Sequence, residues 1–460
     1  MDLKFGLGLG RSGQRTPPPA PESAAAPVAP LREPAVRSSL LDERVKLHQQ
    51  IINEFNLSLL DKIAPDELYR QVGSYIAQYV TQQNLALNQR ELESFTREVI
   101  DEMTGLGPLE PLLKDATVSD ILINTHESVY VERFGQLEPT AIRFKDEAHL
   151  LRIIGKIVSG VGRRIDESSP MVDARLPDGS RVNVAVRPVA VDGPLVSIRK
   201  FSKQPYSMSR LVESGSLKQA MADVLKVAVI GKLSIVVSGG TGSGKTTMLN
   251  ALSSFISLKD RLLTIEDAAE LQLQQPHVLR LETRPPNAEG AGEIRQRELL
   301  KNALRMRPDR IIVGECRGEE AFDMLQAMNT GHEGSMTTVH ANTPRDALSR
   351  LEQMVGMSSI PMTQSSIRSQ IASAINLVVQ LQRLSDGKRR VTSISEVTGM
   401  ESDVMQMQEI YRFVREAVDK EGNIIGHHAA TGIRPKFLAN LQSLGIELPS
   451  THFEPGRPLA

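Results

Sequence analysis

A glycine-rich loop lies between an apolar segment and a helical pattern, and it constrains the fold more than any other feature of the chain. Residues 233–247 read LSIVVSGGTGSGKTT, in which residues 239–246 fit the pattern G-x-x-x-x-G-K-[ST]. Such a loop wraps phosphate groups when a strand precedes it and a helix follows it, because backbone N–H groups and the helix N-terminus then face the anion. Both patterns are present. The loop therefore predicts a phosphate-binding α/β core, with a chance glycine turn as the alternative interpretation.

The residues of this loop have separate predicted roles. Its glycines let the backbone take positive φ and approach phosphate oxygens without a Cβ clash. Lys245 is predicted to reach the β- and γ-phosphates of ATP, and the Thr246 hydroxyl to complete the coordination of Mg²⁺. The predicted nucleotide-binding residues are Gly239, Gly240, Thr241, Gly242, Ser243, Gly244, Lys245, Thr246 and Thr247.

The composition argues against nucleic acid as the working substrate. The chain carries 54 Lys and Arg against 55 Asp and Glu, and its aromatic fraction is 4% with no Trp. It therefore indicates neither a basic surface nor a platform of stacking aromatic rings. Cys316 is the single cysteine, so an intrachain disulfide is impossible and a reducing cytosol fits best.

The sequence also contains no pattern typical of a membrane span or a secretory signal. No stretch approaches the roughly 20 apolar residues that cross a bilayer, because the best candidate, residues 224–238, contains Lys226 and Lys232. The N-terminus has an acid at position 2 and no sustained apolar segment. We expect a cytoplasmic protein whose association with any membrane comes only through a partner.

Shifts in composition divide the 460 residues into five predicted parts. Pro and Ala dominate the start, helical spacing follows, and short apolar runs between turns then indicate an α+β domain. Next, β-branched runs alternate with helical patterns, which indicates crossover connections and a mostly parallel sheet. The parts are a disordered tail (1–39), an N-terminal helical domain (40–95), an α+β domain (96–203), a phosphate-loop core (206–380), and C-terminal hairpins with a helical tail (381–460).

Several elements of these parts are specific enough to test. The α+β domain is expected to have a helix over 146–161, and strands over 118–124, 128–134, 140–144, 180–188 and 195–201. An Asp-Gly pair at 386–387 and a Glu-Gly pair at 421–422 predict two antiparallel hairpins after the core.

Acidic residues follow two predicted strands of the core, where the ligands of open α/β sheets collect. The first strand delivers Glu266 and Asp267 together. One carboxylate can polarise the attacking water, and the other can hold Mg²⁺ through water or pair with an arginine. A solvated strand end with a helix-capping Asp is the alternative. The second strand ends in Glu315, an acid suited to Mg²⁺ beside a phosphate loop, and Arg317 can simply pair with it.

A third cluster, residues 334–343, places His340 near the end of a short strand. A histidine there can sense the γ-phosphate, although a lone histidine is more often structural. None of the nine His residues lies in an H-E-x-x-H arrangement, so the sequence predicts no zinc site made by the protein.

Together with RLETRPPN at 280–287 and NALRMRPD at 302–309, these clusters resemble the secretion or traffic ATPase superfamily. Within it they look most like the ATPases of tight-adherence (Flp) pilus assembly, the CpaF or TadA type. The resemblance implies a RecA-like P-loop NTPase core with ATP and Mg²⁺ as cofactors. In its terms the loop resembles the Walker A box, and Glu266, Glu315 and His340 belong to the Asp, Walker B and His boxes. Glu266 then becomes the first candidate to activate water and Glu315 to organise Mg²⁺, with an exchange of these roles left open, and His340 a γ-phosphate sensor.

The resemblance also implies a homo-oligomer of six subunits, in which an N-terminal domain closes over the nucleotide and contributes arginines. The matching positions are Arg181 in SRVN and Arg199 in VSIRK, with Arg187 as a weaker third. The alternative is that these arginines solubilise a strand face or pair with carboxylates. Because Cys316 is the single cysteine, the four-cysteine zinc element of the type II secretion branch is excluded.

The predicted function is therefore a Mg²⁺-dependent ATPase ring that powers assembly of a tight-adherence pilus or a related secretion system. Closure of the α+β domain on the core would be passed to inner-membrane platform proteins. A DNA-translocating P-loop motor and an ATP-gated scaffold with little turnover are the alternatives. Stimulation of hydrolysis by DNA favours the first alternative, and an absence of turnover favours the second.

Overall fold

The computed structural model describes residues 65–83, 85, 87–201, 207–286, 290–358, 360–442, 445–456 and 459. The predicted tail (1–39), the first part of the predicted helical domain (40–64) and residues 202–206, where the predicted α+β domain meets the predicted core, lie outside the described residues. The chain divides after Met103 into two compact units. The five-part division proposed from the sequence stays a prediction.

In the first unit the described residues form two amphipathic helices, α3 (Pro65–Gln82) and α4 (Gln89–Thr104). Their apolar faces meet in a small core made by Val72, Ile76, Phe95 and Val99. Asn88 begins α4 with a reciprocal cap, because its side chain accepts from Glu91 N while the Glu91 carboxylate accepts from Asn88 N.

The second unit begins with an antiparallel sheet in the order β3-β2-β1-β6-β5-β4. One face of this sheet is covered by α6 (Glu147–Gly160), which starts at the Asp146 cap and lies close to the predicted helix. Short helical segments precede the sheet, namely η1 (Gly107–Leu109) and α5 (Glu110–Lys114). The strands are β1 (Val118–Thr125), β2 (Ser128–Arg133), β3 (Gln136–Pro139), β4 (Met171–Arg175), β5 (Arg181–Ala185) and β6 (Leu195–Arg199).

The strand expected over 140–144 is wrong. Phe134 and Gly135 have φ of 51° and 84°, so the chain turns back at once and β3 lies at Gln136–Pro139 instead. Phe144 is buried against the ring of His149 and does not lie in a strand. A two-residue turn with positive φ at both positions matches the twist of a hairpin, but it was not recognised in a Phe-Gly pair. Strand β4 was also not expected.

The core is a nine-stranded sheet in the order β15-β14-β13-β12-β7-β11-β10-β8-β9. The strands from β12 to β9 in this order are parallel, and β13, β14 and β15 are added antiparallel. This confirms the α/β fold with a mostly parallel sheet, and also the two hairpins at 386–387 and 421–422. The strands are β7 (Ile235–Gly239), β8 (Leu262–Glu266), β9 (Val278–Glu282), β10 (Arg310–Cys316), β11 (Met336–Val339), β12 (Leu377–Arg383), β13 (Arg389–Glu401), β14 (Val404–Val418) and β15 (Ile424–Ala430).

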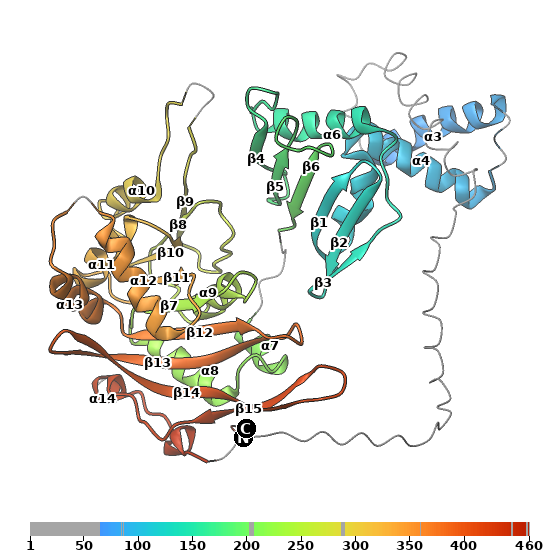
Figure 1. Ribbon diagram of the computed structural model, residues 1–460. Helices are drawn as coiled ribbons and strands as arrows, with labels where there is room; N and C mark the ends of the chain where they lie inside the picture. The colour runs from blue at the N-terminus through green and yellow to red at the C-terminus, as the bar shows by residue number, and fades with distance from the viewer. Residues whose placement is uncertain are drawn as a thin grey trace, which may run out of the picture. The chain divides into compact units, whose positions relative to one another are not determined.

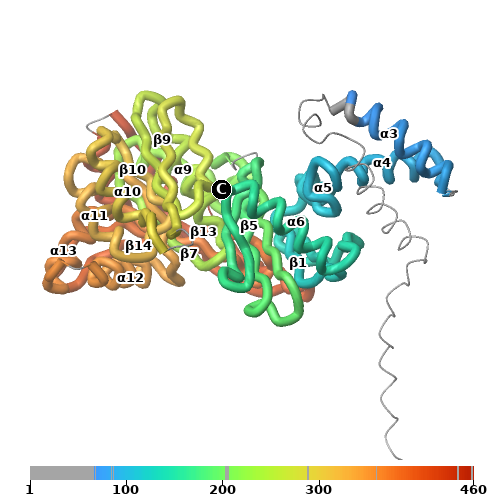
Figure 2. The backbone as a smooth tube through the Cα atoms, turned by 90° about the horizontal axis from the view of Figure 1, so that it is seen from above, coloured from blue at the N-terminus to red at the C-terminus, as the bar shows by residue number. Residues whose placement is uncertain are grey.

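Helices cover both faces of this sheet, as Figure 1 shows. One apolar layer packs under α7 (Met208–Glu213), α8 (Gln219–Ile230), α9 (Lys245–Ser253) and α14 (Phe437–Gln442), with the short η2 (Ser450–Phe453) beside them. The other packs under α10 (Gln296–Ala303), α11 (Glu320–Asn329), α12 (Pro344–Gly356) and α13 (Gln364–Ala374), which lie together on one side of the core in Figure 2. Burial on both faces explains why the core strands read as continuous apolar runs.

The parallel register brings the carboxyl ends of four strands to one edge of the sheet. Strand β11 lies between β7 and β10, pairing Val339 with both Ser238 and Cys316, and β8 follows on the far side of β10. The residues that come directly after these ends are the glycine loop, Asp267, Arg317 and His340. The fold therefore gathers clusters that are up to a hundred residues apart in the chain. None of the described helices combines the length and the hydropathy that crossing a bilayer requires.

Candidate nucleotide-binding site

The glycine loop joins a buried strand to a helix, as the sequence pattern requires. Every residue of β7 is buried, and α9 begins at Lys245 directly after the loop. Gly242 and Gly244 have φ of 68° and 98°, a region that other residues rarely adopt. Gly239 is needed for packing, because a Cβ placed on it would lie 2.6 Å from the Leu381 backbone oxygen. These glycines allow the loop to curl tightly against β12.

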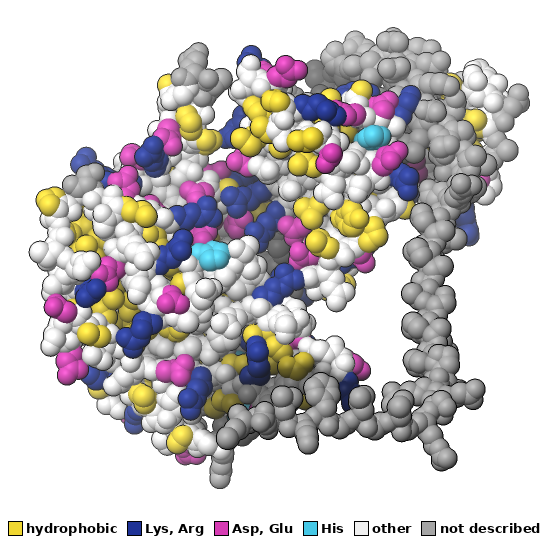
Figure 3. Space-filling view, in the orientation of Figure 1, with side chains coloured by type: hydrophobic (Ala, Val, Ile, Leu, Met, Phe, Trp, Pro, Cys, Tyr) yellow, Lys and Arg dark blue, Asp and Glu magenta, His cyan; other side chains and the backbone are white. Residues whose placement is uncertain are grey.

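A cavity of about 410 Å³ opens at this loop. Figure 3 shows Lys, Arg, Asp and Glu side chains crowded in the hollow at the centre of this face. Of the predicted site residues, Gly239, Gly240 and Arg187 do not line the cavity. The others line it: Thr241, Gly242, Ser243, Gly244, Lys245, Thr246, Thr247, Glu266, Glu315, His340, Arg181 and Arg199. The volume lies within the range of small-molecule sites.

Lys245 is a half-buried cation in the wall of this cavity. Its Nζ donates to the Gly240 carbonyl at 3.1 Å, and no carboxylate forms an ion pair with it among the described residues. Burial lowers the pKa of the Lys245 ammonium, Glu315 opposes this, and Arg317 and Arg199 lower it further. A partly desolvated cation with two other cations near it is a group that an anion would stabilise. The surroundings of Lys245 therefore fit a polyphosphate.

Glu266 ends β8 with its carboxylate almost fully buried, at 3% exposure. Its Oε2 accepts from the backbone N of Glu270 at 2.7 Å and of Leu271 at 2.9 Å. Its Oε1 is buried and has no hydrogen-bond partner among the residues that the structure describes. Burial raises the pKa of the Glu266 carboxyl, although the two backbone donors oppose this. Gly314 makes room for this side chain, because a Cβ there would lie 2.8 Å from Glu266 Cγ.

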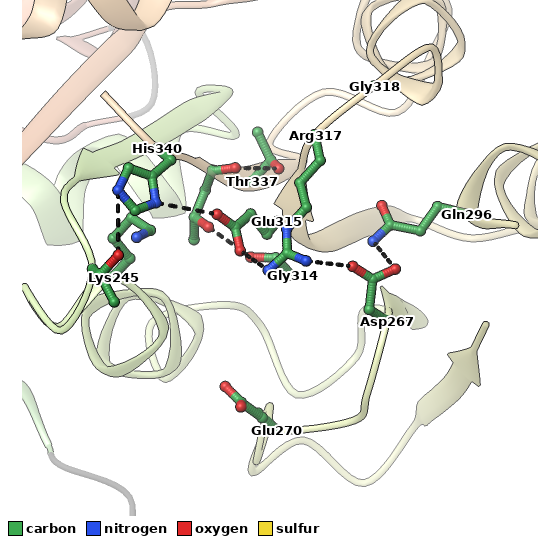
Figure 4. Close-up of polar contacts among 12 residues, drawn as sticks. Lys245, Asp267, Glu270, Gln296, Gly314, Glu315, Arg317, Gly318, Thr337 and His340 are labelled. Carbon is green, nitrogen blue, oxygen red and sulfur yellow. Dashed lines mark hydrogen bonds and ion pairs between the residues drawn. The ribbon is translucent and has the colours of Figure 1, made fainter. Parts of the chain in front are cut away.

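Glu315 is held in a chain of polar contacts that crosses three strand ends (Figure 4). Arg317 Nη2 donates to Glu315 Oε2 at 2.6 Å, and Arg317 Nη1 lies 3.2 Å from Asp267 Oδ2. Gln296 Nε2 then donates to Asp267 Oδ1 at 2.8 Å. The expected pair of Arg317 with Glu315 is present. Asp267 caps no helix, since the next described helix after it starts only at Gln296.

His340 lies between the loop and Glu315. Its Nε2 is 3.5 Å from the Thr241 hydroxyl, and its Nδ1 is 3.8 Å from Glu315 Oε1. Burial and the Lys245 cation lower the pKa of the imidazole, and Glu315 opposes this. A lowered pKa leaves His340 neutral near pH 7, with one N–H to donate and one nitrogen to accept.

Arg181 and Arg199 are direct cross-strand neighbours on β5 and β6, so both side chains point to one face of the antiparallel sheet. Both line the cavity of the phosphate loop of their own chain. Arg181 Nη1 forms an ion pair with Glu270 Oε1 at 2.5 Å. Arg187 does not line the cavity and instead pairs with Glu147 at 3.5 Å.

Among the residues of the cavity wall or its hydrogen-bond chain that were not expected from the sequence, three have long polar side chains. Arg350 reaches the wall from α12, Glu270 from the loop after β8, and Gln296 joins the chain from α10. Nothing in their local sequence distinguishes them from ordinary surface residues. Each reaches the site only because distant segments pack at one sheet edge.

The side-chain oxygens at the loop suit a Mg²⁺ ion that is shared with phosphate groups and water. They do not suit a metal ion that is bound by protein side chains alone. Within the described ranges, no group of three His, Cys, Asp or Glu side chains could hold a metal ion. The Thr246 hydroxyl and the Glu315 carboxylate line the same cavity. Mg²⁺ takes one or two protein oxygens and completes its shell with phosphate oxygens and water, which is the donor set that this cavity offers.

A phosphate loop at the carboxyl edge of a parallel sheet, ringed by two glutamates and a histidine, defines a P-loop nucleotide-binding protein. The comparison with protein families is more specific. The profile of the family described as type II/IV secretion system protein matches residues 102–432, and the chain belongs to this family of secretion ATPases.

Individual relatives cover most of the same region. Rv3659c of Mycobacterium tuberculosis, named for conjugal transfer, is 36% identical over 324 residues, which span 69% of this chain and 92% of that protein. The conjugal transfer protein TrbB of Rhizobium radiobacter is 34% identical over 322 residues, or 69% of this chain and 96% of that protein. The crystal structure of the VirB11 ATPase from the Brucella suis type IV secretion system, in complex with sulphate, is 29% identical, covers 63% of this chain and 95% of that chain, and has a TM-score of 0.34.

Proposed function

We propose that this protein is a Mg²⁺-dependent ATPase that works as a ring motor of a tight-adherence pilus or a related secretion system. The observation that carries the proposal is the cavity itself. It brings the phosphate loop, a desolvated Lys245 and a buried Glu266 with an unpartnered oxygen to one place. Phosphoryl transfer to water requires a cation that binds the phosphates and a base that accepts a proton from the water. Lys245 and Glu266 have these two properties.

Glu266 is our candidate for the general base. Its Oε2 is occupied by two backbone N–H groups, so Oε1 is the atom free to take a proton from water. As that proton leaves, the water oxygen attacks the γ-phosphorus, and the bond to the β–γ bridging oxygen breaks to give ADP and phosphate. The raised pKa makes Glu266 a stronger base than an exposed glutamate.

Glu315 and Thr246 are our candidates for holding Mg²⁺, directly or through water. When bound, the metal would supply positive charge to the phosphate oxygens. Arg317 fixes the Glu315 carboxylate at one oxygen, which leaves the other toward His340. Neutral His340, beside Thr241 of the loop, is placed to donate to a γ-phosphate oxygen.

Arg181 and Arg199 would add charge to the transition state from the α+β domain. Because they sit on a different sheet from the loop, a movement of that domain changes how close they come to the nucleotide. We infer that ATP binding closes this domain on the core and that hydrolysis releases it. A ring of six subunits would pass this movement to inner-membrane platform proteins, with the protein itself on the cytoplasmic side.

The CpaF or TadA subtype rests on the motif resemblance, while the curated relatives are named for conjugal transfer and type IV secretion. Those names support a second candidate, a motor that moves DNA. The nearly equal numbers of cationic and anionic residues and the 4% aromatic content speak against it. ATP hydrolysis at physiological salt that rises severalfold on addition of DNA would favour this candidate.

Lys245→Ala tests the enzymatic proposal. Loss of the loop lysine should abolish both retention of Mg²⁺-ATP and steady-state turnover by the purified oligomer. The reason is that the lysine would contact the phosphates in the ground state and in the transition state. Lys226→Ala, in α8 and outside the cavity, is the matched control and should leave both unchanged. Equal turnover in Lys245→Ala and wild type would remove the ATPase proposal, and binding without turnover in wild type would favour an ATP-gated scaffold.

A further inference from the structure

The hairpin formed by β12 and β13 runs alongside the phosphate loop. Strand β12 pairs with β7 as far as Leu381 and Gly239, and then continues to Arg383, while the segment after β7 enters the loop. In the hairpin, Arg383 lies directly opposite Arg389. The register of the sheet therefore carries two arginines past the end of β7 and next to the loop.

Both arginines lie on the outer side of the loop, at its two positive-φ glycines. Arg389 Nε donates to the Gly242 carbonyl at 2.8 Å, and a Cβ on Gly244 would lie 3.5 Å from Arg389 Cδ. A Cβ on Gly242 would lie 3.7 Å from Arg383 Nη1. Arg383 also donates to the Gly135 carbonyl in the turn between β2 and β3. The loop is thus held between the cavity on one side and the hairpin on the other.

The contact of Arg389 fixes the orientation of one peptide plane. The Gly242 carbonyl and the Ser243 N–H belong to the same trans peptide, so they point in opposite directions. While Arg389 holds the carbonyl outward, Ser243 N points across the loop, where it lies 3.4 Å from the Gly240 oxygen. Peptides next to glycines with positive φ flip easily, since glycine restricts neither orientation. A fixed donor on the outer face removes that freedom.

The charges of this pair also call for an anion. Like charges directly opposite each other on antiparallel strands are destabilising. Neither Arg383 nor Arg389 forms an ion pair with a carboxylate among the side chains that the structure describes. Their neighbour Arg390 does have such a partner. Its Nη2 lies 3.6 Å from Asp386 Oδ2, and its Cζ lies 4.7 Å from the centre of the Phe413 ring. The arrangement leaves two unneutralised cations against the loop, where the phosphates of a nucleotide would offset their repulsion.

We propose that Arg389, with Arg383 beside it, is a positioning residue that braces the phosphate loop from outside and raises its affinity for a nucleoside diphosphate or triphosphate. This inference rests on the proposed function, since it needs the loop to bind a nucleotide. The two arginines would act on binding in the ground state, through the loop backbone, and would touch no reacting atom. Their removal should therefore raise KM more than it lowers kcat.

The test is the dissociation constant for ADP with Mg²⁺, measured by calorimetry on the full-length protein. Arg389→Ala should weaken binding roughly 5- to 10-fold, the effect of losing about one hydrogen bond of ordinary strength. Arg389→Lys keeps the charge but not the planar donor, and should lie between Arg389→Ala and wild type. Lys388→Ala is the matched control, because it removes an exposed cation from the same turn without contacting the loop, and should change binding less than about 2-fold.

Three outcomes decide the inference. Weaker binding in Arg389→Ala alone, with kcat at saturating ATP and the Tm without nucleotide both close to wild type, would support the brace. Equal weakening by Arg389→Ala and Lys388→Ala would overturn it in favour of general charge attraction, and wild-type affinity in Arg389→Ala would overturn it outright. A wild-type protein that binds no ADP would instead contradict the proposed function and leave Arg389→Ala without a measurable difference, so the two failures are distinguishable.

Discussion

The cavity is lined by two regions with opposite physical character. On the core side, Glu266 is 3% exposed and its position is fixed by two backbone donors and by the space at Gly314. On the α+β side, the Arg181 side chain is 40% exposed, and Arg199 is an exposed residue at the end of β6. Buried, hydrogen-bonded groups hold one geometry, while exposed long side chains can adopt several. We infer that the core fixes the chemistry and that the arginines supply the adjustable part.

On the α+β side of the cavity, Arg199→Ala should have the largest effect. If the α+β arginines neutralise charge in the transition state, removal of the Arg199 side chain should lower kcat about 10³-fold and change ATP binding much less. Arg199 is the cleaner choice, because Arg181→Ala would also leave Glu270 without its partner. Arg187→Ala is the control, since Arg187 pairs with Glu147 and does not line the cavity. A similar small effect from both substitutions would assign the arginines to structure alone.

Glu266→Gln and Glu315→Gln should separate the two carboxylates. Loss of the base should lower kcat by roughly 10² to 10⁴, with ATP still bound. Glu315→Gln should instead raise the Mg²⁺ concentration needed for half-maximal activity. Titrating Mg²⁺ in both variants distinguishes the roles. If Glu315→Gln retained ATP uncleaved and Glu266→Gln changed the Mg²⁺ requirement, the two roles would have to be exchanged.

Gly314→Ala probes how rigidly the core holds Glu266. The added Cβ would meet Glu266 Cγ, so the carboxylate must shift, and turnover should fall on the order of 10- to 10²-fold. Gly155→Ala, in the middle of α6, is the control, because no described atom beyond the glycine's chain neighbours and the backbone of its own helix lies within 4 Å of the added Cβ. It should stabilise the α+β domain by about 0.5–1 kcal/mol, through helix propensity, and leave turnover unchanged. Wild-type turnover in Gly314→Ala would show that the base is not held tightly.

The smallest expected effect is on stability. The folded-state pKa of Glu266 is raised, mainly by burial, so its stabilising contribution is present at low pH and is lost as pH rises through that pKa. Glutamine resembles the protonated acid at every pH. Glu266→Gln should therefore have a higher Tm than wild type near neutral pH, and the difference should vanish on acidification. A lower Tm for Glu266→Gln than for wild type at neutral pH would contradict the account of Glu266 as a desolvated carboxylate.

The sequence was sufficient for the features that depend on short segments. A β-branched run, a glycine loop and helical spacing predict β7, the loop and α9, and the parallel sheet follows from repeating that pattern. Because parallel strands end at a common edge, the clusters at Glu266, Glu315 and His340 were expected together, and all three line the cavity. The β3 strand was misplaced because the Phe134–Gly135 turn ends a hairpin without a standard turn pair.

The remaining parts of the site depend on packing between distant segments. Arg350 lies on a helix whose sequence gives no sign of which residue faces a cavity, and Gln296 meets Asp267 only because α10 packs beside β8. Arg389 is separated from Gly242 by 147 positions, and its contact depends on the register between β12 and β7. A single sequence contains no local signal for such pairs.

The pH dependence of kcat/KM tests most directly whether the buried carboxylate of Glu266 is the base. The value of kcat/KM should be calculated from the concentration of fully ionised MgATP, so that protonation of the substrate does not contribute to the pH profile. The acid limb reports the essential base of the free enzyme, and we expect its midpoint above 4.5, the ordinary value for a glutamate. An acid limb at or below that value would contradict the assignment.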